Sequence, residues 1–168
     1  PAFFAPPGEI MVPLVRATVA AVLASLLTGC GPPNYVMMTS AMAPTIERGD
    51  IIVIDMKAYD HARPRRGEMV AYRAPDGPEG KLLMGRVVAA GGEEVSVRDG
   101  TLRLDGRPVD EPFVAEEMDY EVEAMQVPDG HVYILGDNRN DATDSHVFGP
   151  APLHLIEGRI TDVRKPPE

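Results

Sequence analysis

The chain has 168 residues, enough for one domain with a hydrophobic core and too few for two large domains. Its formal net charge of -10 argues against a nucleic-acid partner, because phosphate binding depends on clustered lysines and arginines. A single cysteine excludes an internal disulfide, and the four histidines are not spaced like metal ligands, so we expect neither a metal nor another cofactor.

The first segment with a recognisable pattern is a short apolar run near the N-terminus. Residues 1–10 precede the first methionine; they can lie upstream of the true start, and we assign them no structure. Residues 11–29 contain one arginine followed by an uncharged run, which is the outline of a secretory signal. The run is shorter than the roughly 20 apolar residues that a membrane span needs. We therefore predict an export signal, with a short uncleaved membrane anchor as the alternative.

The apolar run ends in a possible lipid attachment site. Residues 27–30 read Leu-Thr-Gly-Cys and resemble a bacterial lipobox. That resemblance implies that the thiol of Cys30 is acylated and that the mature chain starts there. Two or more acyl chains hold a protein stably on a membrane where one does not. We expect residues 30–35 to be a lipidated tether and residues 36–168 to form one folded domain.

The folded part is predicted to be all-β. Seventeen prolines and sixteen glycines interrupt short apolar runs rich in valine and isoleucine, which favours brief strands over long helices. In chain order the expected strands cover residues 50–56, 68–73, 82–89, 131–135 and 155–163. Residues 94–109 alternate apolar and polar side chains around Asp-Gly pairs, which predicts a hairpin meander. The acidic stretch 116–123 is expected to be a solvated loop and strand edge.

Three segments of this domain carry recognisable motifs. Residues 40–50 read Ser-Ala-Met-Ala-Pro-Thr-Ile-Glu-Arg-Gly-Asp, residues 85–88 read Gly-Arg-Val-Val, and residues 136–145 read Gly-Asp-Asn-Arg-Asn-Asp-Ala-Thr-Asp-Ser. Together, in this order, they resemble the signature of the signal peptidase I family, membrane-bound serine proteases that remove signal peptides. The resemblance runs from about Val36 to Val163. It implies that family's β fold of short antiparallel strands with a small hairpin insert.

The resemblance also implies that certain catalytic side chains are missing. In that family a serine attacks the peptide bond, and a neutral lysine in a desolvating apolar site takes its proton. The nucleophile position corresponds to Ala41, the general-base position to Gly85, and the position of a serine that orients the lysine to Ala142. Because such groups act as a unit and are worth little once one is lost, three empty positions predict a naturally inactive pseudo-peptidase.

Nearby residues are weak substitutes for the missing groups. Ser40 precedes Ala41, but in an extended segment its side chain would point to the opposite face unless a bulge intervenes. Lys81 lies four residues before Gly85, roughly 13 Å away along a strand, and we interpret it as a surface lysine. Thr39 keeps a hydroxyl where the family has an oxyanion-stabilising serine, yet a donor without a nucleophile performs no acyl transfer.

The other residues that match the motifs are expected to build the walls of an empty site. They are Thr39, Met42, Pro44, Arg86, Gly136, Asp137, Asn138, Arg139, Asp144 and Ser145. Their carboxylate, guanidinium and hydroxyl groups can hydrogen-bond the neighbouring backbone and hold the turn in place.

The leading hypothesis is a lipid-anchored pseudo-peptidase on the extracytoplasmic side of a bacterial envelope. We expect it to bind extended peptides or preproteins by adding them as a strand. Two alternatives stay open. One is an active serine endopeptidase that uses Ser40 in a rearranged centre, and the other is a structural envelope lipoprotein.

Overall fold

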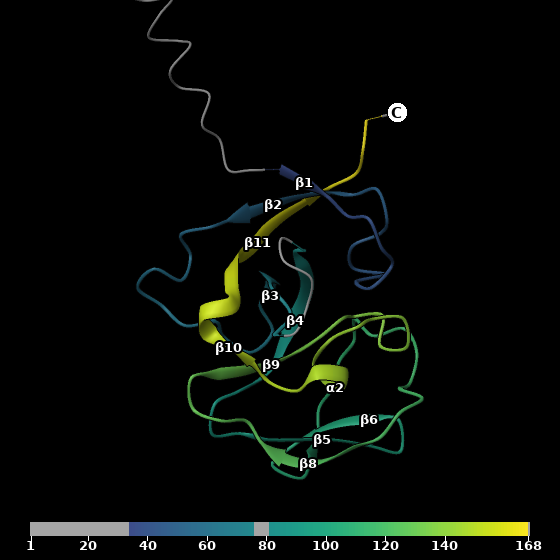
Figure 1. The fold of residues 1–168 in the computed structure, drawn as a ribbon. Coiled ribbons are helices and arrows are strands. Elements are labelled where there is room, and N and C mark those ends of the chain that lie inside the picture. Colours follow the sequence, from purple (N-terminus) through teal and green to yellow (C-terminus); the bar gives the residue numbers. More distant parts are fainter. Residues whose placement is uncertain (1–33, 76–80, 168) are drawn as a thin grey trace, which may run out of the picture. The chain divides into compact units, whose positions relative to one another are not determined.

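The computed structural model of the chain describes residues 34–75 and 81–167 (Figure 1). The regular structure in these ranges is almost entirely β, so the all-β prediction is confirmed. The strands are β1 Asn34–Val36, β2 Ile51–Asp55, β3 Met69–Tyr72, β4 Leu83–Ala90, β5 Glu94–Arg98, β6 Thr101–Leu104, β7 Arg107–Pro108, β8 Val122–Gln126, β9 His131–Leu135, β10 Ala151–Pro152 and β11 Ile156–Arg164. The described helical elements are the short α2 (Ser145–Phe148) and the 3-10 turn η1 (Leu153–Leu155).

The strands form two antiparallel sheets. The larger sheet has seven strands in the order β1-β2-β11-β3-β4-β9-β10, and the smaller one has four in the order β7-β6-β5-β8. Figure 1 shows the small sheet as a separate layer at the bottom of the view, below β4 and β9. The small sheet contains the predicted hairpin meander, which β8 extends at one edge.

Two local differences from the sequence-based expectation have clear causes. Asn34 and Tyr35, which we expected in the tether, belong to strand β1 because they pair with Val53 and Ile52 of β2. In the acidic stretch 116–123, Met118 is buried, since its apolar side chain packs into the core under the small sheet. The stretch is therefore only partly a solvated loop.

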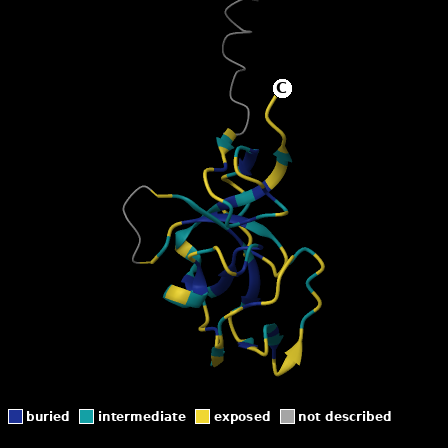
Figure 2. Ribbon diagram, turned by 90° about the vertical axis from the view of Figure 1, so that its right-hand side faces the viewer, coloured by how far each residue is buried: buried dark blue, intermediate teal, exposed yellow. Residues whose placement is uncertain are grey.

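The larger sheet buries side chains on both faces. Strand β3 shows this clearly, because Ala71 packs in one apolar cluster and its neighbours Val70 and Tyr72 pack in another. The first cluster contains Met42, and the second contains Ile134. In Figure 2 the buried residues, in dark blue, lie along the central strands. Both clusters adjoin the segments matched to the catalytic motifs, so the core fixes the position of those segments.

The predictions for the N-terminal segment concern residues that the structure does not describe. The predicted export signal (residues 11–29) and the lipid attachment site at Cys30 are outside the described residues. Within residues 34–75 and 81–167, no helix is both long and apolar enough to cross a bilayer.

Candidate functional site

The segment matched to the nucleophile is a turn. Residues 39–46 are bends and turns, in which the N–H of Ala43 donates to the carbonyl of Ser40 over 2.9 Å. The N–H of Ile46 donates to the carbonyl of Met42 over 2.8 Å, and both of these side chains are fully buried. Our premise of an extended segment around Ser40 is therefore wrong. Strand alternation therefore does not set the direction of the Ser40 side chain.

Three hydrogen bonds join this turn to the segment 136–145. The N–H of Asn138 donates to the carbonyl of Ala41 over 3.1 Å, and the Asn138 side-chain amide donates to the carbonyl of Ser40 over 3.2 Å. The Ser40 hydroxyl donates to the carboxylate of Asp141. The hydroxyl that we considered as a substitute nucleophile is thus held by a carboxylate, which is a far weaker base than a neutral lysine amine.

Gly136 lies between Ala41 and Ala142, two of the residues matched to catalytic positions. A Cβ atom on Gly136 would overlap the carbonyl oxygen of Ala41 and would lie 2.6 Å from the Cβ of Ala142. Only glycine allows the chain to pass this closely. The structure therefore brings Ala41 and Ala142 together around Gly136.

Gly85, matched to the general base, is buried in β4 next to the end of β9. Arg86 pairs with Leu135, and a Cβ atom on Gly85 would lie 3.3 Å from the carbonyl oxygen of Leu135. The same Cβ would overlap Cγ2 of Ile134 and lie 3.3 Å from Cε1 of Tyr72. Ile134 and Tyr72 thus occupy the space in which a longer side chain at this position would start. Neither belongs to a catalytic motif, so the sequence carries no signal of their contact with position 85.

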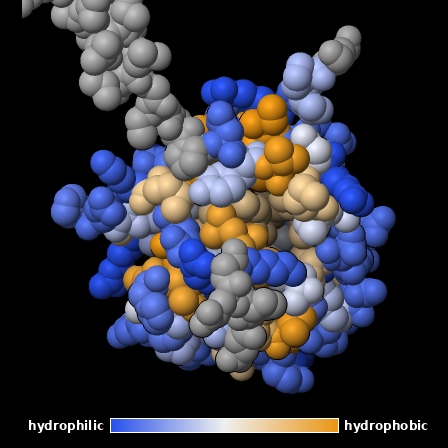
Figure 3. Space-filling model, turned by 45° about the horizontal axis from the view of Figure 1, so that its top comes forward, coloured by the Kyte–Doolittle hydropathy of each residue, from blue (hydrophilic) through white to orange (hydrophobic). Residues whose placement is uncertain are grey.

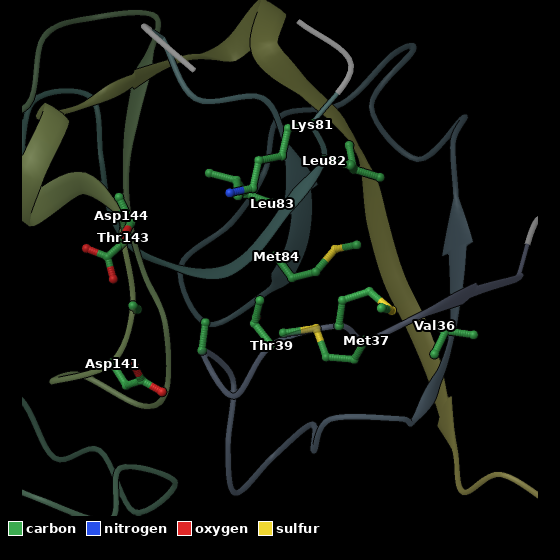
Figure 4. Close-up of a pocket in the computed structure, with 13 residues that line it drawn as sticks. Val36, Met37, Thr39, Lys81, Leu82, Leu83, Met84, Asp141, Thr143 and Asp144 are labelled. Carbon is green, nitrogen blue, oxygen red and sulfur yellow. The ribbon is translucent and has the colours of Figure 1, made fainter. Parts of the chain in front are cut away.

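A cavity of about 370 Å³ opens beside Ala41 and Ala142 (Figure 4). Its lining residues are Val36, Met37, Met38, Thr39, Ala41, Lys81, Leu82, Leu83, Met84, Asp141, Ala142, Thr143 and Asp144. Figure 4 shows Met37 and Met84 on one side and Asp141, Thr143 and Asp144 on the other. We call this the apolar cavity, because methionine and leucine side chains form much of its wall.

Lys81 was expected to be an ordinary surface lysine. It is exposed, but it also lines the upper end of the apolar cavity, with its amine directed toward the side that carries Thr143 and Asp144 (Figure 4). In the described part of the chain, no lysine or histidine side chain hydrogen-bonds to the hydroxyl of Ser40. The serine-amine pair that the alternative of a Ser40-based centre requires is therefore not assembled in these residues. The same residues contain no group of three or more His, Cys, Asp and Glu side chains placed to hold a metal ion.

A bidentate ion pair links β4 to the turn after β9. Nε and Nη2 of Arg86 donate to the two carboxylate oxygens of Asp137 over 2.8 and 2.6 Å, and Asp137 is completely buried. The Arg86 guanidinium also lies 4.0 Å from the centre of the Phe113 ring, a cation-π contact. These contacts hold the turn after β9 against β4, and neither Arg86 nor Asp137 lines the apolar cavity.

Arg139 makes a second buried pair, with a partner that sequence reasoning missed. Its Nη1 and Nη2 donate to the carboxylate of Glu111 over 2.6 and 2.8 Å, and its Nε donates to the carbonyl of Gly136 over 2.9 Å. Glu111 is 28 residues from Arg139 along the chain. It lies in a loop and belongs to no recognisable motif. The pair ties that loop to the chain reversal at Gly136.

Asp144 and Ser145 hold the other end of the segment. The Asp144 carboxylate accepts hydrogen bonds from the N–H of Gly136 over 2.8 Å and of His146 over 3.0 Å, and it also lies 2.8 Å from Nδ1 of His146. The Ser145 hydroxyl accepts the N–H of Ile134 over 3.0 Å. Asp144 also caps helix α2. The side-chain oxygens thus satisfy buried N–H groups and fix the cavity wall.

Asp50 holds the other end of the turn that carries Ala41. Its Oδ2 accepts a hydrogen bond from the N–H of Glu47 over 2.9 Å and another from the Lys165 ammonium over 3.2 Å. The Glu47 hydrogen bond outweighs the effect of burial and, together with Lys165, lowers the pKa of Asp50 below its ordinary value of 3.8.

An Asp50→Asn variant is expected to lose stability at neutral pH but little in acid. Because the folded-state pKa is lowered, the carboxylate stabilises the fold above about pH 3.8, and this contribution is lost as the pH falls through the folded-state pKa. Urea unfolding of both proteins across this range measures the gap. Asp60→Asn, at an exposed position, is the control and should show little change. A gap that stays equally large in acid would contradict this account.

Known proteins that are similar to this chain are named as signal or processing peptidases. Residues 10–163 match the family described as "Signal peptidase, peptidase S26". Probable signal peptidase I-1 of Synechocystis sp. is 36% identical over 154 residues, which cover 88% of this chain and 77% of that protein. Thylakoidal processing peptidase 1, chloroplastic, of Arabidopsis thaliana is 37% identical over 155 residues, which cover 86% of this chain but 45% of that protein. The chain thus spans less than half the length of the plant relative.

A solved structure supports the same relationship. The crystal structure of a signal peptidase I from Enterococcus faecalis superposes with a TM-score of 0.53 and 28% sequence identity. The superposition covers 59% of this chain and 97% of that one.

Proposed function

The chain belongs to the signal peptidase family, peptidase S26, and we propose that it is a pseudo-peptidase that binds extended peptides without cutting them. The observation that carries the proposal is the set of side chains at the three matched positions. Ala41 has no attacking oxygen, Gly85 has no base, and Ala142 cannot orient one. Hydrolysis by the family's chemistry needs the first two together.

The packing around Gly85 supports the loss of catalysis. Ile134 and Tyr72 fill the space into which a lysine side chain would extend. Tyr72 is completely buried, and burial raises the pKa of its hydroxyl, so it stays protonated and is a poor base. Neither Ile134 nor Tyr72 can therefore act as the general base in place of the lysine.

A free strand edge supports peptide binding. Strand β3 pairs with β4 from Leu83 to Arg86, whereas β9 pairs with β4 only from Arg86 onward. Within residues 34–75 and 81–167, the start of β4 thus has no strand partner on its second side, and residues 82–84 also line the apolar cavity. An exposed edge with free N–H and C=O groups accepts an extended segment as an added strand.

We also propose that Cys30 is lipidated and that the domain sits on the extracytoplasmic side of a bacterial membrane. Support comes from the apolar surface next to the start of the domain, where Val36 and Met38 are 55% and 67% exposed. Figure 3 shows hydrophobic side chains, in orange and tan, gathered around a recess on the face turned toward the viewer. Mass measurement of the mature N-terminus tests the lipid attachment.

Incubation of the purified protein with a preprotein is expected to give binding but no cleavage. Binding is measured by fluorescence anisotropy with a labelled signal-sequence peptide, and cleavage by gel and mass spectrometry. Cleavage by the unaltered protein would overturn the pseudo-peptidase proposal. If that cleavage disappears in Ser40→Ala, the active centre uses Ser40. A folded protein that binds no peptide would instead favour a structural role in the envelope.

A further inference from the structure

We infer that the apolar cavity selects a bulky apolar side chain from the bound peptide, in preference to alanine. This inference rests on the proposed peptide binding and names the class of peptide that the site takes. It depends on three properties of the cavity: its size, the chemistry of its wall, and its position along the free edge of β4.

The size of the cavity suits a large side chain. Its volume is about 370 Å³, whereas an apolar cavity of about 150 Å³ is already large enough to bind benzene. Ala41 and Ala142 contribute to this space, because each side chain ends at Cβ where the family places a serine. An alanine side chain of a peptide would leave most of the cavity unfilled.

The chemistry of the wall suits an apolar occupant. Met37, Met38 and Met84 present flexible, polarisable thioethers that adapt to large side chains. In Figure 4 the sulfur atoms of Met37 and Met84 lie on the same side of the cavity, below the leucines.

The charged groups of the wall do not offset the cost of burying a cation in the cavity. The Asp144 carboxylate already accepts two backbone N–H groups, and the Asp141 carboxylate accepts the Ser40 hydroxyl. Lys81 places a positive charge at the upper end of the cavity. A lysine or arginine of the peptide would meet two carboxylates and one like charge, but its cation would lose hydration against the methionine and leucine wall, a cost that an apolar side chain does not have.

The position of the cavity limits the preference to alternate peptide residues. Successive side chains of a strand point to opposite faces. A peptide added along residues 82–84 thus directs every second side chain toward the apolar cavity and the others away from it. The bulky residue is needed at one position of such an extended segment.

Labelled octapeptides of serine and threonine with one central variable residue test the inference by fluorescence anisotropy. The variable residue is alanine, leucine, methionine or lysine. Each buried CH2 group is worth about fourfold in affinity, so leucine and methionine peptides should bind about ten- to sixtyfold more tightly than the alanine peptide. The lysine peptide should bind no more tightly than the alanine peptide.

A pair of methionine variants links the preference to the cavity. Met38 lines the cavity and is 67% exposed, so Met38→Glu should fold and should weaken leucine-peptide binding about fivefold or more. Met56 is 37% exposed and does not line the cavity, so Met56→Glu should leave binding unchanged.

Two results would overturn the inference in distinguishable ways. If peptides bind but alanine or lysine is preferred to leucine, the inference fails and the proposed peptide binding stands. If none of the peptides binds the folded protein, the proposed function fails and this inference fails with it.

Discussion

Adding back the three missing groups, through Ala41→Ser, Gly85→Lys and Ala142→Ser, is expected to give no peptidase until Ile134 is also shortened to alanine. A Cβ atom at position 85 would overlap Cγ2 of Ile134, and it would lie 3.3 Å from the Leu135 carbonyl oxygen, which belongs to the backbone and cannot turn away. Extra atoms in a well-packed core force side chains out of their preferred rotamers at a cost of typically about 1–3 kcal/mol. The new lysine would be displaced from the site or would destabilise it.

In the quadruple variant the lysine stem occupies space released by Ile134→Ala. A positioned general base contributes about 10²- to 10⁴-fold to a rate, and we expect a rise of this order in preprotein cleavage over the triple variant. Ile134→Ala alone is the control and should stay inactive. Thermal unfolding of each variant identifies any that fail to fold. Equal cleavage by the triple and quadruple variants would show that Ile134 is no barrier.

Glu111→Ala is expected to cost about 3–5 kcal/mol of the free energy of unfolding. The substitution leaves the guanidinium of Arg139, which is fully buried, without the carboxylate that accepts two of its hydrogen bonds. Removing one partner of a buried ion pair is destabilising on this scale, because the remaining charge is desolvated and unpaired. Since Arg139 also holds the carbonyl of Gly136, the loss should reach the turn that supports Ala41.

Denaturant unfolding monitored by circular dichroism measures this cost. Glu123→Ala is the matched control, because Glu123 is exposed on the edge strand β8 and a surface substitution usually changes stability by less than about 0.5 kcal/mol. A loss below about 1 kcal/mol for Glu111→Ala would mean that water reaches and solvates the Arg139 guanidinium.

Local patterns in the sequence were enough to predict most of the fold. The runs that became β2, β3, β9 and β11 were recognisable because short apolar segments with β-branched or aromatic residues lie between glycine and proline breaks. The hairpins of the small sheet followed from alternation around Asp99-Gly100 and Asp105-Gly106, where the structure has left-handed backbone at both residues of each pair. Strand β1 was missed, because its pairing with β2 rather than its composition makes it a strand.

The motifs also predict which catalytic side chains are absent, because that prediction depends only on residue identity at matched positions. Ala41, Gly85 and Ala142 can be read from the sequence without coordinates. The direction of the Ser40 side chain cannot, because it depends on a turn whose carbonyls are held by Asn138, about a hundred residues away. The same is true of Lys81, whose place on the cavity wall depends on three separate segments meeting.

Most of the strands, the family signature and the residues at its matched positions follow from the sequence alone. The surroundings of these positions follow from the tertiary structure: Ile134 and Tyr72 lie against Gly85, Glu111 pairs with Arg139, and a methionine-lined cavity opens beside Ala41. The reason is physical. Strand formation depends on neighbours along the chain, whereas the filling of a site depends on which distant side chains the packed core brings into contact.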